Sequence, residues 1–380
     1  MDSSIAIGAA LLWTASLCWL VGTTGFALLQ PLKRRSPRHA PQLPAVSIIV
    51  PTSIVDDARS AADRRAALAG LLALDYPSYE VLVCIDRGSD DGRLAGELRR
   101  TFPPDRIRVL VAADQSSASA KVDAMASGAA AARHDVLLFC DDDVQLDPRH
   151  LTRLVAQQAS GVGMVSAAAI GIRPENLWGE LELAFMNGQF ARMHLTSDFL
   201  GIGGALGKSM LLTRTDIERA GGLLRTGGDC CEDAALTQNL GAVGLRTVLG
   251  DLPVRQPIGL QRFGDVWRRH CRWLSCRRKY IPVSFAAEAL FSAPVASLAG
   301  AVACRGLALD PVAGAVATAG LWCAIDSLLI VLSRWHWSPL TPLAWLLREV
   351  LFLPLWASAL FARTVLWYGR PVPVTGNRGS

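Results

Sequence analysis

Charged residues are scarce in this 380-residue chain: 19% of its residues are Asp, Glu, Lys or Arg, and 51% are hydrophobic. A fully soluble enzyme rarely has so apolar a sequence, and a pure bundle of membrane helices rarely carries this much charge. The composition therefore predicts a soluble domain joined to membrane helices. The net charge of +5 is concentrated at residues 33–38 and 268–279, so it does not indicate a nucleic-acid-binding surface.

Metal-ligand spacings are also absent from the sequence. None of the nine cysteines forms a CxxC pair, and the six histidines show no spacing typical of a metal site. Cys18, Cys304 and Cys323 lie in apolar runs. These features argue against a zinc site and against a disulfide framework, and they predict reduced thiols in a cytoplasmic setting.

The N-terminal region contains a long uncharged run at residues 5–29, which exceeds the roughly 20 residues that span a bilayer. Basic residues at 33–38 follow it, the reverse of the order in a cleaved signal peptide. We therefore expect an uncleaved transmembrane anchor over residues 1–32. The positive-inside rule then places the residues that follow in the cytoplasm.

The C-terminal region contains three apolar stretches of near-spanning length, at residues 283–304, 312–332 and 343–362. They predict about three transmembrane helices within residues 281–365 and a tail at 366–380. Buried helices of a soluble domain are the alternative.

Charged residues interrupt two of these stretches: Glu288 the first, and Arg348 with Glu349 the third. An adjacent ion pair inside a span is expected to face the helix bundle or to lie near an interface. The basic segment at residues 261–280 is expected to form an interfacial helix attracted to anionic lipid.

Residues 41–260 have the pattern of an α/β domain. Apolar runs predict strands at residues 46–50, 79–85, 107–111 and 135–140, with helices between them at 61–74, 92–102 and 119–132. Alternating strands and helices predict a mostly parallel sheet, whose ligands bind beyond the carboxyl ends of the strands.

Asp141, Asp142 and Asp143 follow the fourth predicted strand directly. Three adjacent carboxylates repel one another, so the run is either a cation site or an acidic surface turn. Its position at a strand's carboxyl end, which Asp86 shares at the second strand, favours the cation site.

Two further motifs come later in the chain: Glu232-Asp233 after a glycine pair, and Arg269-His-Cys-Arg272-Trp273 before the apolar stretches. Asp-x-Asp, Glu-Asp and Arg-x-x-Arg-Trp, in this order, resemble the motifs of membrane-bound family 2 glycosyltransferases. The short single-site layout looks most like the ceramide glucosyltransferase group, family 21. The resemblance covers residues 45–280 and implies a GT-A type nucleotide-sugar-binding domain.

The resemblance also implies a role for each motif. Asp233 would be the general base that deprotonates the acceptor hydroxyl, with Glu232 supporting it. Asp143 and Asp141 would hold Mg²⁺ or Mn²⁺ at the diphosphate, with Asp142 as the variable middle residue. The other implied residues are Lys121, Asp141, Arg269, Arg272 and either Asp86 or Asp90 for the nucleotide sugar, and Trp273 and Gly207 for the acceptor.

Some of these residues have simpler explanations. Glu232 and Asp233 would also suit the N-terminus of a helix, and Lys121 could be an ordinary exposed lysine. In many relatives the acidic residue that contacts the base lies one place after Asp86, where this chain has Arg87. Asp86 and Asp90 therefore remain alternatives.

The motifs and the flanking helices together predict an inverting glycosyltransferase. It would move a sugar, with glucose expected, from a UDP-sugar to the hydroxyl of a membrane lipid, with ceramide expected. The alternatives are a hopanoid, diacylglycerol or polyprenyl phosphate acceptor, a short polysaccharide synthase, or a non-catalytic membrane scaffold. The expected setting is the bacterial inner membrane, with the catalytic domain in the cytoplasm.

Overall fold

The computed structural model describes residues 3–33, 43–52, 58–86, 92–113, 117, 119–228, 231–367 and 370–374. The chain divides into two compact units, which we describe separately. The α/β unit comprises Lys33–Ile170, Gly201–Pro257 and Arg363–Ser380. The helical unit comprises Met1–Leu32, Gly171–Leu200 and Ile258–Ala362.

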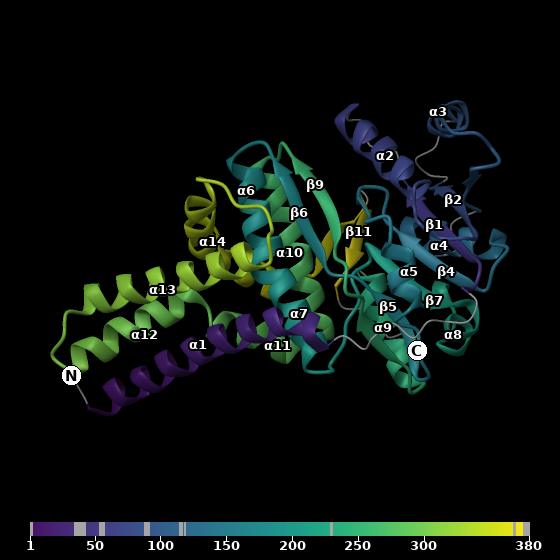
Figure 1. Ribbon diagram of the computed structural model, residues 1–380. Helices are drawn as coiled ribbons and strands as arrows, with labels where there is room; N and C mark the ends of the chain where they lie inside the picture. The colour runs from purple at the N-terminus through teal and green to yellow at the C-terminus, as the bar shows by residue number, and fades with distance from the viewer. Residues whose placement is uncertain are drawn as a thin grey trace. The chain divides into compact units, whose positions relative to one another are not determined.

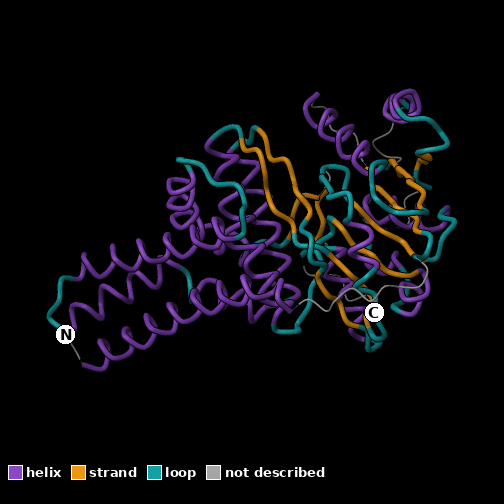
Figure 2. Tube along the Cα trace, in the orientation of Figure 1, coloured by secondary structure: helices purple, strands orange, loops and turns teal. Residues whose placement is uncertain are grey.

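A seven-stranded sheet forms the centre of the α/β unit, in the order β3–β2–β1–β4–β7–β5–β8 (Figures 1 and 2). The strands are β1 (Val46–Thr52), β2 (Tyr79–Ile85), β3 (Ile107–Val111), β4 (Val136–Cys140), β5 (Val162–Ser166), β7 (Ser209–Thr213) and β8 (Arg246–Leu249). Only the pairs that β7 forms, with β4 and β5, are antiparallel among the strand pairs of this sheet in the described residues. The predicted mostly parallel sheet and its four predicted strands are therefore confirmed.

Helices between these strands complete the α/β unit. They are α2 (Ala58–Leu71), α3 (Arg93–Thr101), α4 (Ala120–Ala131), α5 (His150–Val155), α8 (Arg214–Arg219) and α9 (Glu232–Ala242), with the 3₁₀ helix η3 (Leu223–Thr226). At Gly128 of α4, an added Cβ would lie 2.4 Å from a side-chain atom of Ile49 and 2.7 Å from Cys84 Sγ. Only glycine therefore allows α4 to pack this closely on β1 and β2.

The carboxyl ends of β1, β2 and β4 lie at one edge of the sheet, because these three strands run parallel. Every residue of β1 and β4 is buried, as expected for central strands of an α/β sheet. The first polar residues after β4 are Asp141–Asp143, so the three carboxylates lie at this edge of the sheet.

Two small two-stranded sheets accompany the large one. β6 (Ala169–Pro174) pairs with β9 (Val254–Gly259). β10 (Thr364–Trp367) pairs antiparallel with β11 (Arg370–Pro373) and belongs to the α/β unit. Part of the segment predicted as a tail is therefore a hairpin.

The helical unit contains α1 (Ser3–Leu29), α6 (Leu177–Leu183), the π-helix η2 (Ala184–Ala191), α7 (Arg192–Phe199), α10 (Phe263–Tyr280), α11 (Pro282–Leu290), α12 (Ala293–Gly306), α13 (Pro311–Leu332) and α14 (Thr341–Phe361). Figure 1 shows α1, α12 and α13 side by side. Residues 171–200 belong to this unit, although their position in the sequence lies inside the predicted α/β segment.

Three helices among the described residues are long and apolar enough to cross a membrane: Ser3–Leu32, Pro311–Leu332 and Thr341–Phe361. The stretch predicted as a span at 283–304 instead forms two helices, α11 and α12, with a 45° bend between them. Pro294, which has no N–H to donate, lies in the first turn of α12 and favours a new helix start there. The chain is a membrane protein, and the first of its three C-terminal apolar stretches is broken into two helices.

Buried ion pairs connect the helices of this unit. Asp326 on α13 is 1% exposed and accepts hydrogen bonds from Arg192, Arg348 and Trp345. Arg348 also donates its Nε–H to Glu349 at 2.8 Å. The predicted inward orientation of the Arg348–Glu349 pair is confirmed for Arg348, which is 2% exposed.

Two cysteines differ from the predicted reduced thiols. Cys18, Cys84, Cys140, Cys271, Cys304 and Cys323 have free thiols, but Cys231 and Cys276 are disulfide-bonded. The prediction of reduced thiols is wrong for these two. Disulfide formation depends on the distance between sulfur atoms in the folded chain, which the spacing of cysteines along the sequence does not reveal.

Candidate active site

Lys121, in the first turn of α4, lies at the centre of a charged cluster in the α/β unit. Its Nζ atom is 2.8 Å from Asp141 Oδ1 and 2.6 Å from Glu232 Oε1. It also donates a hydrogen bond to the Gly207 carbonyl at 3.2 Å. Lys121 is 5% exposed, so it is not the ordinary surface lysine that the sequence left open. Its ammonium group compensates two carboxylates that repulsion would otherwise drive apart.

Gly207, just before β7, has no room for a side chain. An added Cβ would lie 2.8 Å from Glu232 Oε1 and 3.0 Å from Lys121 Nζ. Its N–H donates to Asp233 Oδ2 at 2.8 Å. The glycine therefore lets the backbone approach the carboxylates closely enough to bind both Lys121 and Asp233.

Asp233, in the first turn of α9, is held by two backbone N–H groups. Gly207 donates to Oδ2 and Ala234 donates to Oδ1, each at 2.8 Å. Burial and the adjacent charge of Glu232 raise the pKa of Asp233 to about 6, against the opposing charge of Lys121. A carboxylate with this pKa is ionised at neutral pH and is a stronger base than an ordinary aspartate, which suits a general base.

Asp141 and Asp143 both contact Lys208, which the sequence did not identify as a site residue. Lys208 Nζ is 3.4 Å from Asp141 Oδ2 and 3.2 Å from Asp143 Oδ1. Burial opposes ionisation of Asp141, but Lys121 and Lys208 outweigh it and hold the pKa of Asp141 below its usual range. The only sequence signal for Lys208 was its place beside Gly207.

Gln256 is a second residue that the sequence did not reveal. Its Nε2 donates to Asp143 Oδ2 at 2.6 Å, while its buried Oε1 has no hydrogen-bond partner among the described residues. No short motif marks this glutamine, which lies on β9, far along the chain from β4.

The donor set at Asp141 and Asp143 fits a divalent cation shared with a nucleotide. No group of three His, Cys, Asp or Glu side chains that could hold a metal occurs among the described residues. Mg²⁺-type sites at phosphates, however, use one or two protein carboxylates, and water and phosphate oxygens complete the shell. Asp141 and Asp143 already converge on one cationic group, the ammonium of Lys208.

Asp142 has different partners from its two neighbours. Its Oδ2 accepts a hydrogen bond from Thr52 Oγ1 at 2.7 Å and from Arg64 Nε at 2.8 Å. The side chain of Arg64 is 6% exposed. Asp142 therefore ties β4 to β1 and α2, which agrees with a variable middle residue that binds no metal.

We predict that Asp142→Ser lowers the stability of the protein but leaves the rate of sugar transfer nearly unchanged. Removing the carboxylate leaves Arg64 buried without this partner, which costs about 3 kcal/mol of the free energy of unfolding. Thermal melts should show this loss, and the double variant Arg64→Met/Asp142→Ser should recover part of it. Activity per folded molecule should stay close to wild type. A folded Asp142→Ser protein as inactive as Asp143→Ala would contradict the assignment.

Asp86 lies at the same sheet edge, directly after β2. It is 7% exposed, and its N–H donates to the Thr52 carbonyl at 3.0 Å. Asp90 and Arg87 lie outside the described residues, so the choice between Asp86 and Asp90 as the base-contacting acid stays a prediction.

The Arg-x-x-Arg-Trp motif lies on α10 of the helical unit. Arg269 Nη1 is 2.9 Å from Glu182 Oε1, and His270 Nε2 is 3.1 Å from Glu182 Oε2. Burial opposes ionisation of Glu182, but the charges of Arg269 and His270 dominate and lower its pKa to about 2. Glu182 is a positioning partner of Arg269 that the sequence did not indicate.

Aromatic rings complete the surroundings of this motif. The ring of Phe185 stacks on His270 with centroids 4.2 Å apart, which supports a structural role for His270. Trp273 packs edge-on against Phe190 at 4.6 Å. Arg272 lies on the same helix, between His270 and Trp273. The phosphate and acceptor roles of Arg269, Arg272 and Trp273 remain predictions.

Comparison with known proteins identifies similar sequences and folds. A family model described as glycosyl transferase family 21 matches residues 7–378. Ceramide glucosyltransferase 1 of Caenorhabditis elegans is 23% identical over 338 residues, which cover 86% of this chain and 71% of the relative. Ceramide glucosyltransferase 3 of the same organism is 21% identical over 335 residues, covering 86% of this chain and 72% of the relative.

One solved structure is similar over nearly the whole chain. The mannosyltransferase PcManGT from Pyrobaculum calidifontis, in complex with GDP-Man and Mn²⁺, gives a TM-score of 0.55 at 16% identity. The match covers 92% of this chain and 99% of that one. At this identity the likeness concerns the fold alone, and it confirms the predicted GT-A type architecture.

Proposed function

This chain belongs to glycosyl transferase family 21, and from that premise we propose that it transfers glucose from UDP-glucose to the hydroxyl of ceramide. The relatives named as ceramide glucosyltransferases support the sugar and the lipid, and the apolar helices support a membrane acceptor. The environment of Asp233 carries the proposal, because a buried, anchored carboxylate of raised pKa is what removal of a hydroxyl proton requires.

In the proposed reaction, Asp233 takes the proton of the acceptor hydroxyl as the hydroxyl oxygen attacks the anomeric carbon. The bond between that carbon and the diphosphate oxygen breaks, and its electron pair leaves with UDP. A single displacement inverts the anomeric configuration. The N–H groups of Gly207 and Ala234 hold the Asp233 carboxylate in one orientation before the acceptor arrives.

The neighbours of Asp233 tune its basicity. Burial and the charge of Glu232 raise the pKa of Asp233, and the positive charge of Lys121 limits this rise. Lys208 pairs with Asp141 and Asp143 at the place where the diphosphate is expected, and its charge helps to lower the pKa of Asp141. Asp141 and Asp143 would hold Mg²⁺ or Mn²⁺, which when bound neutralises the charge that develops on the departing diphosphate.

The remaining site residues have supporting roles in the proposal. Arg269 and Arg272 would grip phosphate oxygens, since a guanidinium can donate two parallel hydrogen bonds. Asp86 would contact the uracil, and Trp273 and Gly207 would border the acceptor. We propose a cytoplasmic orientation for the catalytic domain, in a bacterial inner membrane, from the basic residues that follow the N-terminal span.

The proposal is tested by incubating membranes that contain the protein with a panel of UDP-sugars and lipids. Mass spectrometry should detect glucosylceramide, and NMR should show a β-linked product from the α-linked donor. Chelation of divalent ions should abolish the product, and Mn²⁺ or Mg²⁺ should restore it. A product on diacylglycerol, a hopanoid or polyprenyl phosphate alone, or an extended polymer, would overturn the ceramide assignment.

A further inference from the structure

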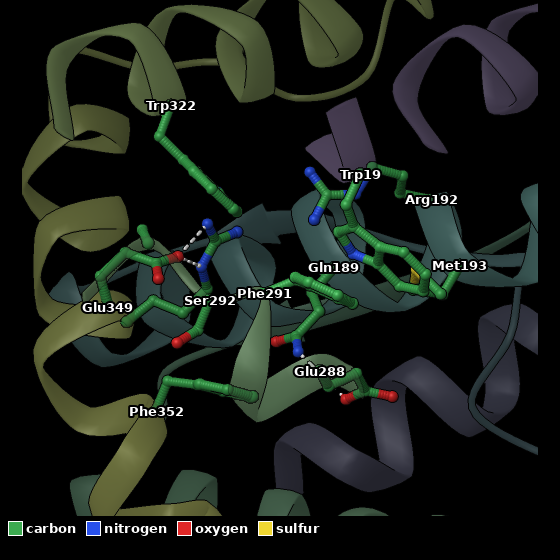
Figure 3. A pocket seen from close by; sticks show the side chains of 12 residues that line it. Trp19, Gln189, Arg192, Met193, Glu288, Phe291, Ser292, Trp322, Glu349 and Phe352 are labelled. Atoms are coloured by element: carbon green, nitrogen blue, oxygen red, sulfur yellow. Dashed lines mark hydrogen bonds and ion pairs between the residues drawn. The ribbon is translucent and has the colours of Figure 1, made fainter. Parts of the chain in front are cut away.

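The helical unit encloses a small pocket, which is lined by Arg192, Glu288 and several aromatic side chains (Figure 3). Its volume is about 30 Å³. A buried water molecule needs about 15 Å³ of such space, so the pocket has room for about two waters and is too small for an organic ligand. The α/β unit instead contains a buried serine, Ser166, whose hydroxyl group contacts a turn of the candidate active site.

Ser166 is the last residue of β5 and is fully buried. β5 runs parallel to β4, because both strands pair antiparallel with β7, so its carboxyl end lies at the same edge of the sheet as Asp141. The Ser166 hydroxyl accepts a hydrogen bond from the Leu206 N–H at 3.0 Å and donates to the Ser209 carbonyl at 2.9 Å. The Leu206 carbonyl lies 3.2 Å from the same oxygen. One side chain thus holds both ends of the turn at residues 206–209.

The two central residues of this turn contact the charged groups of the site. The Gly207 N–H donates to Asp233 Oδ2 at 2.8 Å, and the Gly207 carbonyl accepts from Lys121 at 3.2 Å. The Lys208 carbonyl accepts from the Asp141 N–H at 3.3 Å, and Lys208 Nζ lies 3.4 Å from Asp141 Oδ2. The orientation of the expected base and of Asp141 therefore depends on where this turn is held.

The main-chain hydrogen bond that closes the turn is long, with the Ser209 nitrogen 3.4 Å from the Leu206 carbonyl oxygen. A second side-chain link is present at Ser209, whose buried hydroxyl lies 2.9 Å from His150 Nε2 at the start of α5. Burial lowers the pKa of His150 to about 4, so its ring is neutral at physiological pH. The hydroxyl groups of Ser166 and Ser209 therefore tie the turn to β5 and α5.

We propose that Ser166 is a positioning residue of the active site, whose hydroxyl fixes the turn so that the Gly207 N–H points at Asp233. The inference rests on the proposed function for the role of Asp233 as base. Burial and the charge of Glu232 disfavour the ionised form of Asp233. The Gly207 N–H and the charge of Lys121 favour it. A turn without the Ser166 hydroxyl would hold the Gly207 N–H less firmly, so the base would keep its proton up to a higher pH and would be less well oriented.

The pH–rate profile of Ser166→Ala tests this role, because the substitution removes the hydroxyl partner of Leu206 and Ser209. We expect the rate of glucosylceramide formation at about pH 8 to fall about tenfold, and the acidic limb of the profile to move up by about 0.5 pH unit. Ser166→Cys nearly keeps the side-chain volume but offers a weaker donor and acceptor, so it should show a smaller shift in the same direction. Wild-type acidic limbs in both variants would overturn the inference.

Ser47→Ala is the matched control. Ser47 is also fully buried, near the start of β1 at the opposite edge of the sheet. Its hydroxyl donates to Glu80 at 2.8 Å and accepts from the His134 N–H at 3.2 Å. The control should lower the Tm about as much as Ser166→Ala and should keep the wild-type acidic limb. An acidic limb that moved as far in Ser47→Ala as in Ser166→Ala would reduce the role of Ser166 to general stability.

Ser166→Thr separates positioning from packing. It keeps the hydroxyl group but adds a methyl group at a fully buried position, which lowers the Tm. We expect its acidic limb to stay at the wild-type pH despite this loss of stability. A limb shifted as far as in Ser166→Ala would show that the hydroxyl is not the group that matters.

Thermal melts test the same inference without any sugar transfer. The difference in Tm between a protein and its Asp233→Asn counterpart follows the ionisation of Asp233, and its pH midpoint should be about 0.5 unit higher in the Ser166→Ala background. A shifted midpoint in a chain whose wild type forms no glucosylceramide would contradict the proposed function alone. Glucosylceramide formation with an unshifted midpoint would contradict the role of Ser166 alone.

Discussion

Asp233→Asn is expected to lower kcat by about 10²- to 10⁴-fold, the usual contribution of a general base, and to leave the KM for UDP-glucose little changed. The substitution removes the proton acceptor but keeps the size and position of the side chain. Steady-state rates of glucosylceramide formation in membranes would measure the effect. Glu97→Gln is the matched control and should keep full activity, because Glu97 forms an exposed ion pair with Arg65.

The fold of this variant needs its own measurement. Both Asp233 oxygens accept backbone N–H groups, so an asparagine must turn its NH₂ toward one of them and lose that bond. Loss of the buried charge offsets this cost at neutral pH, so we expect a Tm close to wild type. A folded Asp233→Asn protein with full activity would remove Asp233 from the role of base.

The Asp233 carboxyl group is expected to make both the activity and the stability of the protein depend on pH. Because the pKa of Asp233 is raised to about 6 from the ordinary 3.8, activity should fall as pH drops through about 6. The folded state binds this proton more tightly than the unfolded state. The stability contribution of Asp233 is therefore fully present below pH 3.8 and is lost as pH rises through about 6. The stability of Asp233→Asn relative to wild type should therefore rise as the pH rises from about 4 to about 6, because the variant has no carboxyl group to ionise.

Lys121→Met is expected to have the second large effect, on stability and chemistry together. It keeps the side-chain volume but removes the ammonium group that pairs with Glu232 and Asp141. Breaking a buried pair in this way costs about 3–5 kcal/mol of the free energy of unfolding. Denaturant titration would measure the loss. Arg65→Met, which breaks an exposed pair, should cost less than about 1 kcal/mol.

Lys121→Met should also shift the pH dependence of the transfer rate. Lys121 lowers the pKa of Asp233, so its removal should move the acidic limb of the pH–rate profile to higher pH. A folded variant with the wild-type profile would show that Lys121 does not act on the base. A profile moved to lower pH would contradict the charge arrangement itself.

Local patterns predicted much of the fold and part of the site. The apolar runs at 46–50 and 79–85 became β1 and β2, because a buried parallel strand needs an unbroken apolar stretch. Asp141 and Asp143 were found because a strand end and a motif mark them. The sequence did not predict Lys208 and Gln256 as site residues. A lysine or a glutamine can be recognised as part of the site only by its contact with Asp143, which requires the folded structure.

The sequence by itself determined the parallel part of the sheet, the N-terminal span and the family motifs, because each depends on residues close together in the chain. Only the tertiary structure decided that Lys121 lies between Asp141 and Glu232, that Asp142 anchors Arg64, and that the segment at 283–304 is two helices. It also placed Arg192 and Glu288 around one pocket. The partner of a buried charge depends on distance in space, and that distance exists only once the chain has folded.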